Sequence, residues 1–150
     1  DKVHVPQVFT ERALDADLKP TTHPIQVPIR HTGDGENAFD MISYAKGACW
    51  VKVLDNFVGR DTLKRGMQKY FSRFAHKNTF LKDMVNSINE AWNERTSSVD
   101  DSQLDLIKWT DSWLMTQGPS TLLAEFDSQT KKISIRQGFG NKYASEVYRE

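Results

Sequence analysis

The sequence predicts a mainly α-helical fold followed by a β-hairpin. Between residues 37 and 118, apolar side chains recur every three or four residues, which is the repeat of helices with one buried face. From residue 122 to residue 135 the apolar residues alternate with polar ones instead, which is typical of strands. With 150 residues, of which 38% are hydrophobic, the chain is long and apolar enough to fold around a core.

Residues 1–35 are expected to form an extended or loop-like lead-in. Four prolines oppose a long helix here, because proline removes a backbone donor and clashes with the preceding turn. One short helix is still expected from Phe9 to Leu18, and Thr32–Gly35 predicts a turn. Between them, Ile25, Val27 and Ile29 alternate with other residues and predict an extended segment.

The first long helix is expected to start at Asn37 and to run through Phe39 as far as Phe57. Nearly its whole circumference is apolar between Ala45 and Leu54, so we expect it to be mostly buried. Gly59 is expected to end it, because glycine readily adopts the left-handed conformation that closes helices.

Three further helices are expected before residue 118. Asp61 is expected to cap the second helix and Asn78-Thr79 to open the third. The polar segment Thr96–Asp101 then leads to the fourth helix, which Gly118-Pro119 ends. The apolar positions of these helices are Leu63, Met67, Tyr70, Phe71 and Phe74; Leu81, Met84, Val85, Ile88 and Trp92; and Leu104, Ile107, Trp109 or Thr110, Trp113 and Leu114.

The predicted hairpin has one strand around Leu122–Phe126 and a second around Ile133–Ile135. Asp127–Thr130 supplies turn-forming residues between them. After the hairpin, Gly138–Asn141 is expected to form a loop, and the remaining residues fit strand or coil equally well.

Charge and cysteine content exclude several classes of function. The 20 basic and 20 acidic residues cancel, so no basic excess exists to neutralise nucleic-acid phosphates. No apolar run is long enough to span a bilayer. Cys49 is the single cysteine, which rules out an internal disulfide or a cysteine-based zinc site and agrees with an expected cytoplasmic location.

Two local patterns suggest chemistry and fail on closer inspection. Ser43 and Lys46 match the Ser-x-x-Lys pattern of serine acyl-enzymes, but the companion motifs Ser-Asp-Asn and Lys-Thr-Gly are absent. The four histidines show no His-Glu-x-x-His arrangement and no helical metal-ligand spacing, so no metal site is expected in this chain. His23 precedes Pro24 and is expected to anchor a loop by hydrogen bonding.

A set of ordered motifs resembles a known family. The segment Thr22-His23-Pro24-Ile25 is followed by Phe39-Asp40-x-x-Ser43-Tyr44-x-Lys46-Gly47-Ala48 and then by Phe57-Val58-Gly59. Further motifs are Gly66-x-x-x-Tyr70-Phe71, Asn78-Thr79-x-x-x-Asp83 and Trp113-Leu114-x-Thr116-x-Gly118-x-x-Thr121-Leu122. In this order and spacing the chain resembles the zinc metallo-aminopeptidases of the gluzincin class, the aminopeptidase N family, and specifically their bacterial, actinobacterial-like branch.

The resemblance implies a place for this chain within a larger enzyme. Residues 1–119 would be the second, helical half of a thermolysin-like catalytic domain, and residues 120–150 the start of a β-sandwich domain. The family's zinc ligands, a His-Glu-x-x-His helix and a later Glu, would lie upstream of Thr22, as would the Gly-x-Met-Glu-Asn loop that holds the substrate's amine. The chain is therefore expected to be a fragment that contacts the remaining catalytic and N-terminal domains of its parent protein.

The resemblance also assigns roles to individual residues. Tyr44 matches the tyrosine whose hydroxyl stabilises the tetrahedral intermediate, although packing in the core is the alternative. Phe39 occupies a position that lines the pocket for the substrate's first side chain in some members, and a place in the core is nearly as well supported. Gly47 is expected to permit close packing, and Lys46 to pair with a carboxylate outside the chain.

The function expected from this resemblance is zinc-dependent removal of N-terminal residues from peptides. The intact enzyme would carry one zinc ion, with its ligands outside this chain, and the chain alone would be inactive. The alternative is a non-catalytic helical scaffold from a relative that lost its zinc site.

Overall fold

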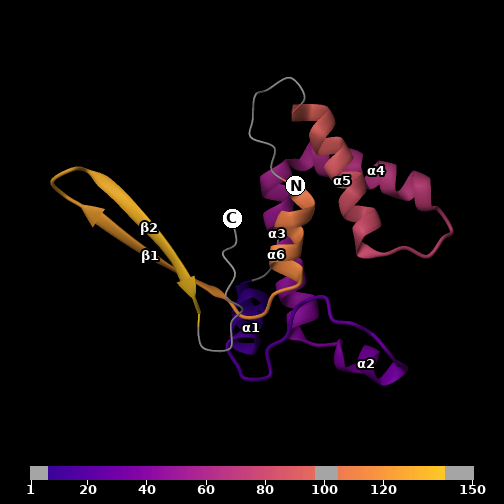
Figure 1. Cartoon of the computed structure of the whole chain (residues 1–150), viewed down its shortest axis with the longest axis horizontal. Coiled ribbons are helices and arrows are strands. Elements are labelled where there is room, and N and C mark those ends of the chain that lie inside the picture. Colours follow the sequence, from indigo (N-terminus) through magenta and orange to yellow (C-terminus); the bar gives the residue numbers. More distant parts are fainter. Residues whose placement is uncertain (1–6, 97–104, 141–150) are drawn as a thin grey trace. The chain divides into compact units, whose positions relative to one another are not determined.

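The computed structural model describes residues 7–96 and 105–140, and it confirms a mainly α-helical chain with a β-hairpin at its C-terminal side (Figure 1). These residues divide into two compact units. One unit lies within Cys49–Asp111, and the other combines the residues up to Ala48 with those from Ser112 onward. The boundary falls within two helices, α3 (Gly47–Val58) and α6 (Leu106–Leu114).

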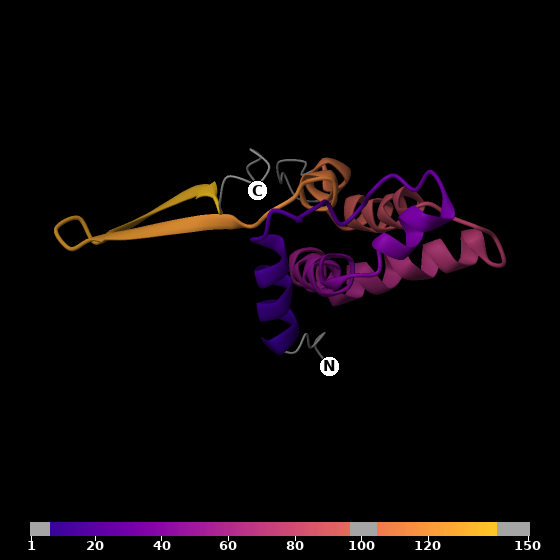
Figure 2. The same ribbon diagram turned by 90° about the horizontal axis from the view of Figure 1, so that it is seen from below.

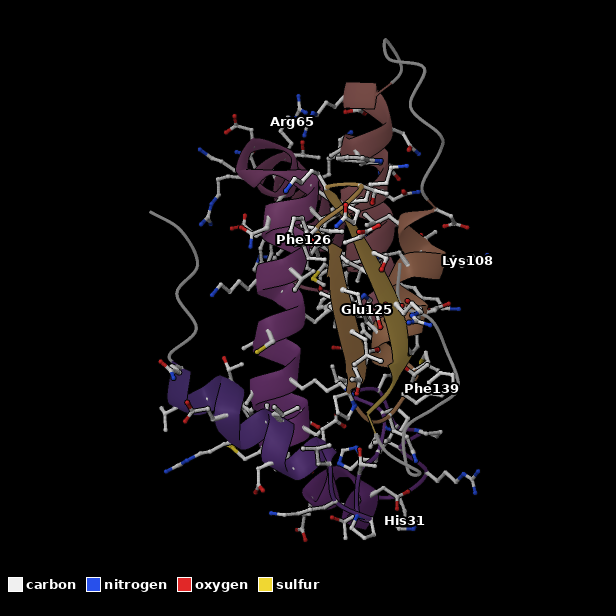
Figure 3. All side chains as sticks on the ribbon, turned by 90° about the vertical axis from the view of Figure 1, so that its left-hand side faces the viewer. His31, Arg65, Lys108, Glu125, Phe126 and Phe139 are labelled. Carbon is white, nitrogen blue, oxygen red and sulfur yellow. The ribbon has the colours of Figure 1, made fainter. Side chains whose placement is uncertain are left out.

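The lead-in is more helical than expected. Helix α1 (Gln7–Asp17) agrees with the helix predicted near Phe9–Leu18. The predicted turn at Thr32–Gly35 is wrong, because these residues form the first part of a short helix, α2 (Thr32–Asn37). Asp34 explains the difference: its Oδ2 accepts the backbone N–H groups of Arg30 and His31, at 2.9 and 3.3 Å, and so satisfies donors at the helix start. Figure 3 labels His31 beside this helix.

The segment between α1 and α2 forms no strand. The Gln26 N–H in this segment donates to the Leu114 carbonyl at 2.9 Å. The alternation of Ile25, Val27 and Ile29 therefore corresponds to irregular backbone.

The first long helix of the prediction consists of two pieces. A π-helical turn, η1 (Ile42–Lys46), passes directly into the α-helix α3 (Gly47–Val58). Phe39 lies before η1, so the prediction that the helix includes it is wrong. Gly59 follows α3 with a φ of 82°, which confirms the predicted helix end.

Helix α3 buries one face, so the expectation of a mostly buried helix is wrong. Trp50, Leu54 and Val58 are at most 4% exposed. Val51, Val53 and Phe57 of the same helix are 37–42% exposed. Phe57 stacks on Trp109 of helix α6, with ring centroids 5.6 Å apart.

Helices α4 (Arg60–Phe74) and α5 (Leu81–Thr96) pack side by side in the Cys49–Asp111 unit (Figures 1 and 2). Gly66 of α4 makes the approach possible, because a β-carbon there would lie 2.6 Å from the Ile88 Cα. Asp61 is not the cap of α4 as predicted; Gly59 occupies that position and Asp61 lies in the first turn. Phe71 is 64% exposed and does not belong to the buried face, in contrast to the prediction.

Helix α6 (Leu106–Leu114) contributes to both units. The predicted connection after Thr96 and the predicted helical position Leu104 lie outside the described residues. The core of the Cys49–Asp111 unit is apolar and consists of Trp50, Leu54, Val58, Val85, Ile88, Ala91, Leu106 and Trp109.

The predicted hairpin is confirmed, with strand β1 (Ser120–Asp127) antiparallel to β2 (Lys132–Phe139) (Figure 2). Strand β2 is longer than expected, since Gly138 and Phe139 belong to it and not to a loop. Cross-strand partners share a face, so Leu122, Phe126, Ile133 and Ile135 lie on one side of the ribbon. Figure 3 shows the hairpin with its side chains and labels Phe126 together with Glu125 and Phe139.

Candidate functional site

Tyr44 lies in the π-helical turn η1, and its side chain does not belong to the core. The residue is 57% exposed, and its hydroxyl has no hydrogen-bond partner among residues 7–96 and 105–140. The hydroxyl is therefore available to a molecule outside the described chain. π-Helical turns are rare and often occur at functional sites, because the additional residue in the turn changes where side chains point.

Phe39 is the aromatic neighbour of Tyr44. The ring centroids of Phe39 and Tyr44 are 6.0 Å apart, and the two planes are tilted by 40°. Phe39 is 73% exposed, so it too lies outside the core of this chain. The two residues that the sequence selected thus form one exposed aromatic pair, with a phenol hydroxyl beside an apolar ring.

Asp40 organises the beginning of the turn that carries Tyr44. Its Oδ1 accepts the Ser43 N–H at 2.9 Å, and its backbone carbonyl accepts the Tyr44 N–H at 3.1 Å. Its Oδ2 lies 2.7 Å from His23 Nε2. The carboxylate therefore connects η1 to the Thr22-His23-Pro24 segment.

Both ring nitrogens of His23 face hydrogen-bond acceptors. Nε2 faces the Asp40 carboxylate, and Nδ1 lies 2.7 Å from the Pro24 carbonyl oxygen. Two acceptors require two N–H donors, which the imidazolium form provides. The predicted role of His23 as a loop anchor is confirmed.

The electrostatics favour a charged pair at this place. Burial alone would lower the pKa of His23, but the hydrogen bonds to the Pro24 carbonyl and to Asp40 outweigh it and leave the pKa raised above 6.5. Burial would likewise raise the pKa of Asp40, but the Ser43 N–H and His23 outweigh that effect and lower the pKa below 3.8. Between these values the pair consists of an imidazolium and a carboxylate.

Asp17 forms a second, more deeply buried centre. Asp17 is only 3% exposed, and its Oδ2 lies 2.8 Å from Lys46 Nζ. Its Oδ1 accepts hydrogen bonds from the Thr22 hydroxyl at 2.6 Å and from the Gly118 N–H at 3.0 Å. The predicted partner of Lys46 outside the chain is thus replaced by Asp17 within it. Sequence reasoning missed Asp17, and the available signal was that it lies four residues after Ala13, on the buried face of α1.

Gly47 and the Ser43–Lys46 pattern can also be compared with the structure. A β-carbon at Gly47 would meet only Ile25, at an ordinary contact distance of 3.9 Å, so Gly47 does not provide a close approach among the described residues. The serine–lysine pattern has no catalytic geometry, because the Lys46 ammonium pairs with Asp17 while the buried Ser43 Oγ makes no hydrogen bond within the described part of the chain.

The described residues do not fit a zinc ion. Within residues 7–96 and 105–140, no three His, Cys, Asp or Glu side chains converge in a way that could hold a metal. His23 has both nitrogens engaged by the Pro24 carbonyl and by Asp40, which leaves no lone pair for a metal. Every helix in these residues is also too short or too polar to cross a membrane.

Comparison with known proteins gives several matches over most of the chain. The chain is 37% identical over 129 residues to aminopeptidase N of Streptomyces lividans, a match that covers 83% of the chain and 14% of that protein. It is 37% identical over 90 residues to leucyl aminopeptidase of Saccharolobus solfataricus, covering 60% of the chain and 12% of that protein. It is 30% identical over 137 residues to aminopeptidase N of Haemonchus contortus, covering 91% of the chain and 14% of that protein.

These matches indicate which branch of aminopeptidases the chain resembles and how much of a relative's length it covers. The similarity to a Streptomyces protein agrees with the actinobacterial-like motifs in the sequence. The chain spans only about an eighth to a seventh of the length of these relatives. The model of the peptidase family M1 domain matches residues 3–113, which include Asp17, Asp40 and Tyr44. The chain therefore belongs to peptidase family M1.

Proposed function

We propose that this chain is part of a zinc-dependent aminopeptidase that removes N-terminal residues from peptides, and that Tyr44 is its contribution to catalysis. The observation that carries this proposal is the position of Tyr44. The residue is 57% exposed and its hydroxyl has no hydrogen-bond partner among the described residues, although the aromatic ring and the backbone contact neighbours. A tyrosine that served only the core would instead bury its ring and satisfy its hydroxyl.

The proposed role of Tyr44 is to donate a hydrogen bond to a developing oxyanion. When water attacks a peptide carbonyl, negative charge grows on the carbonyl oxygen, and a fixed O–H donor lowers the energy of that state more than the energy of the bound substrate. A neutral phenol is suited to this role because it donates without having to release its proton. Loss of one such donor typically reduces kcat by about 10²–10³.

Phe39 has a separate proposed role in binding. Its exposed ring lies beside Tyr44 and offers an apolar surface next to the hydroxyl. The side chain of the substrate's first residue would contact this surface while Tyr44 addresses the neighbouring carbonyl. Truncation of Phe39 is therefore expected to alter KM and the preference among first residues more than it alters the rate of the chemical step.

The zinc ion of the proposed enzyme must be held by residues other than those described, since these do not fit it. The purified 150-residue chain is expected to hydrolyse no aminoacyl-anilide. Clear zinc-dependent hydrolysis by the chain alone would contradict this expectation.

The test of the proposed function is Tyr44→Phe in the full-length protein that carries this sequence. We expect kcat for an aminoacyl-anilide to fall by about 10²–10³ while KM changes by only a few-fold, because the lost bond acts mainly in the transition state. Tyr70→Phe is the matched control: the Tyr70 hydroxyl is paired with Thr79 Oγ1 at 2.6 Å, so its loss should reduce stability and leave kcat unchanged. A Tyr44→Phe protein that keeps kcat within a few-fold would remove the assigned role. A parent protein without any peptidase activity would favour a scaffold function instead.

A further inference from the structure

Two separate segments of the chain meet at one carboxylate. The Thr22-His23-Pro24 segment lies before helix α2, whereas Asp40 and Tyr44 lie after it. The ion pair between His23 Nε2 and Asp40 Oδ2, 2.7 Å apart, connects them. Nothing in the chemistry proposed for Tyr44 uses either residue, so the pair needs an explanation of its own.

The geometry of Asp40 provides that explanation. One carboxylate oxygen accepts the Ser43 N–H, and the backbone carbonyl of the same residue accepts the Tyr44 N–H. Two successive amides in the first turn of η1 are thus attached to Asp40. A helix start leaves such N–H groups without partners in the helix itself, so the residue that accepts them determines where the helix begins.

His23 fixes the orientation of the Asp40 carboxylate in turn. Its Nδ1 donates to the Pro24 carbonyl, which holds the ring, and its Nε2 then donates to Asp40. The side chains of His23 and Asp40 are 25% and 36% exposed, so the pair is partly protected from water. The resulting chain of contacts runs from the Pro24 carbonyl through His23 and Asp40 to the backbone of Ser43 and Tyr44.

We propose that Asp40, oriented by His23, is a positioning residue that sets the start of the π-helical turn and thereby the location of the Tyr44 hydroxyl. This inference rests on the proposed function of Tyr44. Asp40 itself touches no substrate in this scheme. Its effect on the rate arises because an oxyanion donor works only at hydrogen-bond distance, and a displacement of about 1 Å can cost about 10²-fold in rate.

The experiment is a double-mutant cycle in the full-length protein, with Asp40→Ala, Tyr44→Phe and the combined variant. Asp40→Ala is expected to lower kcat at least about tenfold while KM stays within about threefold. The combined variant is expected to be no slower than Tyr44→Phe alone, within about twofold, because a misplaced hydroxyl and a missing hydroxyl are equivalent losses. A residue that merely supports the fold would instead lower kcat in both backgrounds.

Two further variants separate positioning from general stability. Asp83→Ala is the matched control, since Asp83 also caps a helix start by accepting the Phe80 N–H at 2.8 Å, but in α5; it should reduce stability and leave kcat unchanged. Asp40→Asn keeps an oxygen that can accept the Ser43 N–H and loses the charge that faces His23. It should therefore lose less kcat than Asp40→Ala, and it replaces Asp40→Ala in the cycle if the alanine variant does not fold.

The outcomes distinguish this inference from the function on which it rests. If Tyr44→Phe is slow while the Asp40 variants keep kcat within twofold, the positioning role is wrong and the role of Tyr44 stands. If the losses from Asp40 and Tyr44 multiply, Asp40 does not act through Tyr44 and the inference is overturned. If Tyr44→Phe retains full kcat, the proposed function and the positioning role fail together.

Discussion

Gly66→Ala is expected to destabilise the chain, although alanine is normally the better helix former. Gly66 lies within α4, where its missing side chain allows α5 to approach. A β-carbon built there would lie 2.6 Å from the Ile88 Cα and 2.9 Å from Ile88 Cγ1. Ordinary carbon contacts are about 3.5–4.0 Å, so the overlap is about 1 Å. Because one of the overlapped atoms belongs to the backbone, a rotamer change cannot relieve it, and the two helices must move apart.

The magnitude follows from two opposing effects. Overpacking of a buried contact costs about 1–3 kcal/mol, and a clash with backbone belongs at the upper end of that range. Alanine recovers about 1 kcal/mol through its higher helix propensity. The net change in the free energy of unfolding is therefore a loss of about 2 kcal/mol, equivalent to a decrease in Tm of about 4–8 °C in a chain of this size.

The assay is urea unfolding followed by circular dichroism, with Gly35→Ala as the control. Gly35 is also helical, but no atom lies within 4 Å of the position that its β-carbon would take, so this change should leave stability equal or slightly higher. The expected result for Gly66→Ala is a lower denaturation midpoint with an unchanged m-value. An unchanged or higher midpoint would refute the close approach of α4 and α5 on which the reasoning depends.

The buried and partly buried ion pairs give two further predictions. Lys46→Met should lower the free energy of unfolding by about 3–5 kcal/mol, because it leaves the Asp17 carboxylate buried without its cation. Calorimetry that showed a loss below about 1 kcal/mol would contradict this prediction. For His23, whose pKa is raised above 6.5, the stabilising contribution is complete below that pH and is lost as the pH rises through the raised value. The stabilising contribution of Asp40 is complete above pH 3.8 and is lost as the pH falls through the lowered pKa of its carboxyl. The pair therefore stabilises the fold most between pH 3.8 and pH 6.5. NMR titration should therefore give His23 a pKa above 6.5, and Asp40→Asn should lower the pKa of His23. A His23 pKa at or below 6.5 in the unmodified protein would be incompatible with the ion pair.

The elements that the sequence predicts well are those whose signal is local. The three- and four-residue repeat located α3, α4, α5 and α6, and the alternation around residues 122–135 located the hairpin. Gly59 was predictable as a helix end because a positive φ is far easier for glycine than for other residues. Each of these inferences needs only neighbouring residues.

The features that escaped prediction depend on contacts between distant residues. Nothing near Lys46 indicates that its partner is Asp17, because the two meet only when α1 packs beside η1. The π-helical turn has no compositional signature, and its beginning depends on Asp40. The helix at Thr32 forms because Asp34 satisfies backbone donors that a turn assignment ignores. The motifs indicate Phe39 and Tyr44 as candidate site residues, whereas the interactions that support these two residues arise from segments that are distant in the sequence.

The π-helical turn has a consequence for how relatives of this chain should be aligned. A π turn is an α-helix into which one extra residue has been accommodated, and each residue of an α-helix corresponds to a rotation of about 100°. A relative that lacks one residue between Ile42 and Lys46 would continue as an uninterrupted α-helix and keep its buried stripe along α3. Everything before the turn, including the Phe39 ring, would then face a different direction. An alignment gap of one residue at this position therefore marks a change in the orientation of the aromatic pair, even where both aromatic residues are retained.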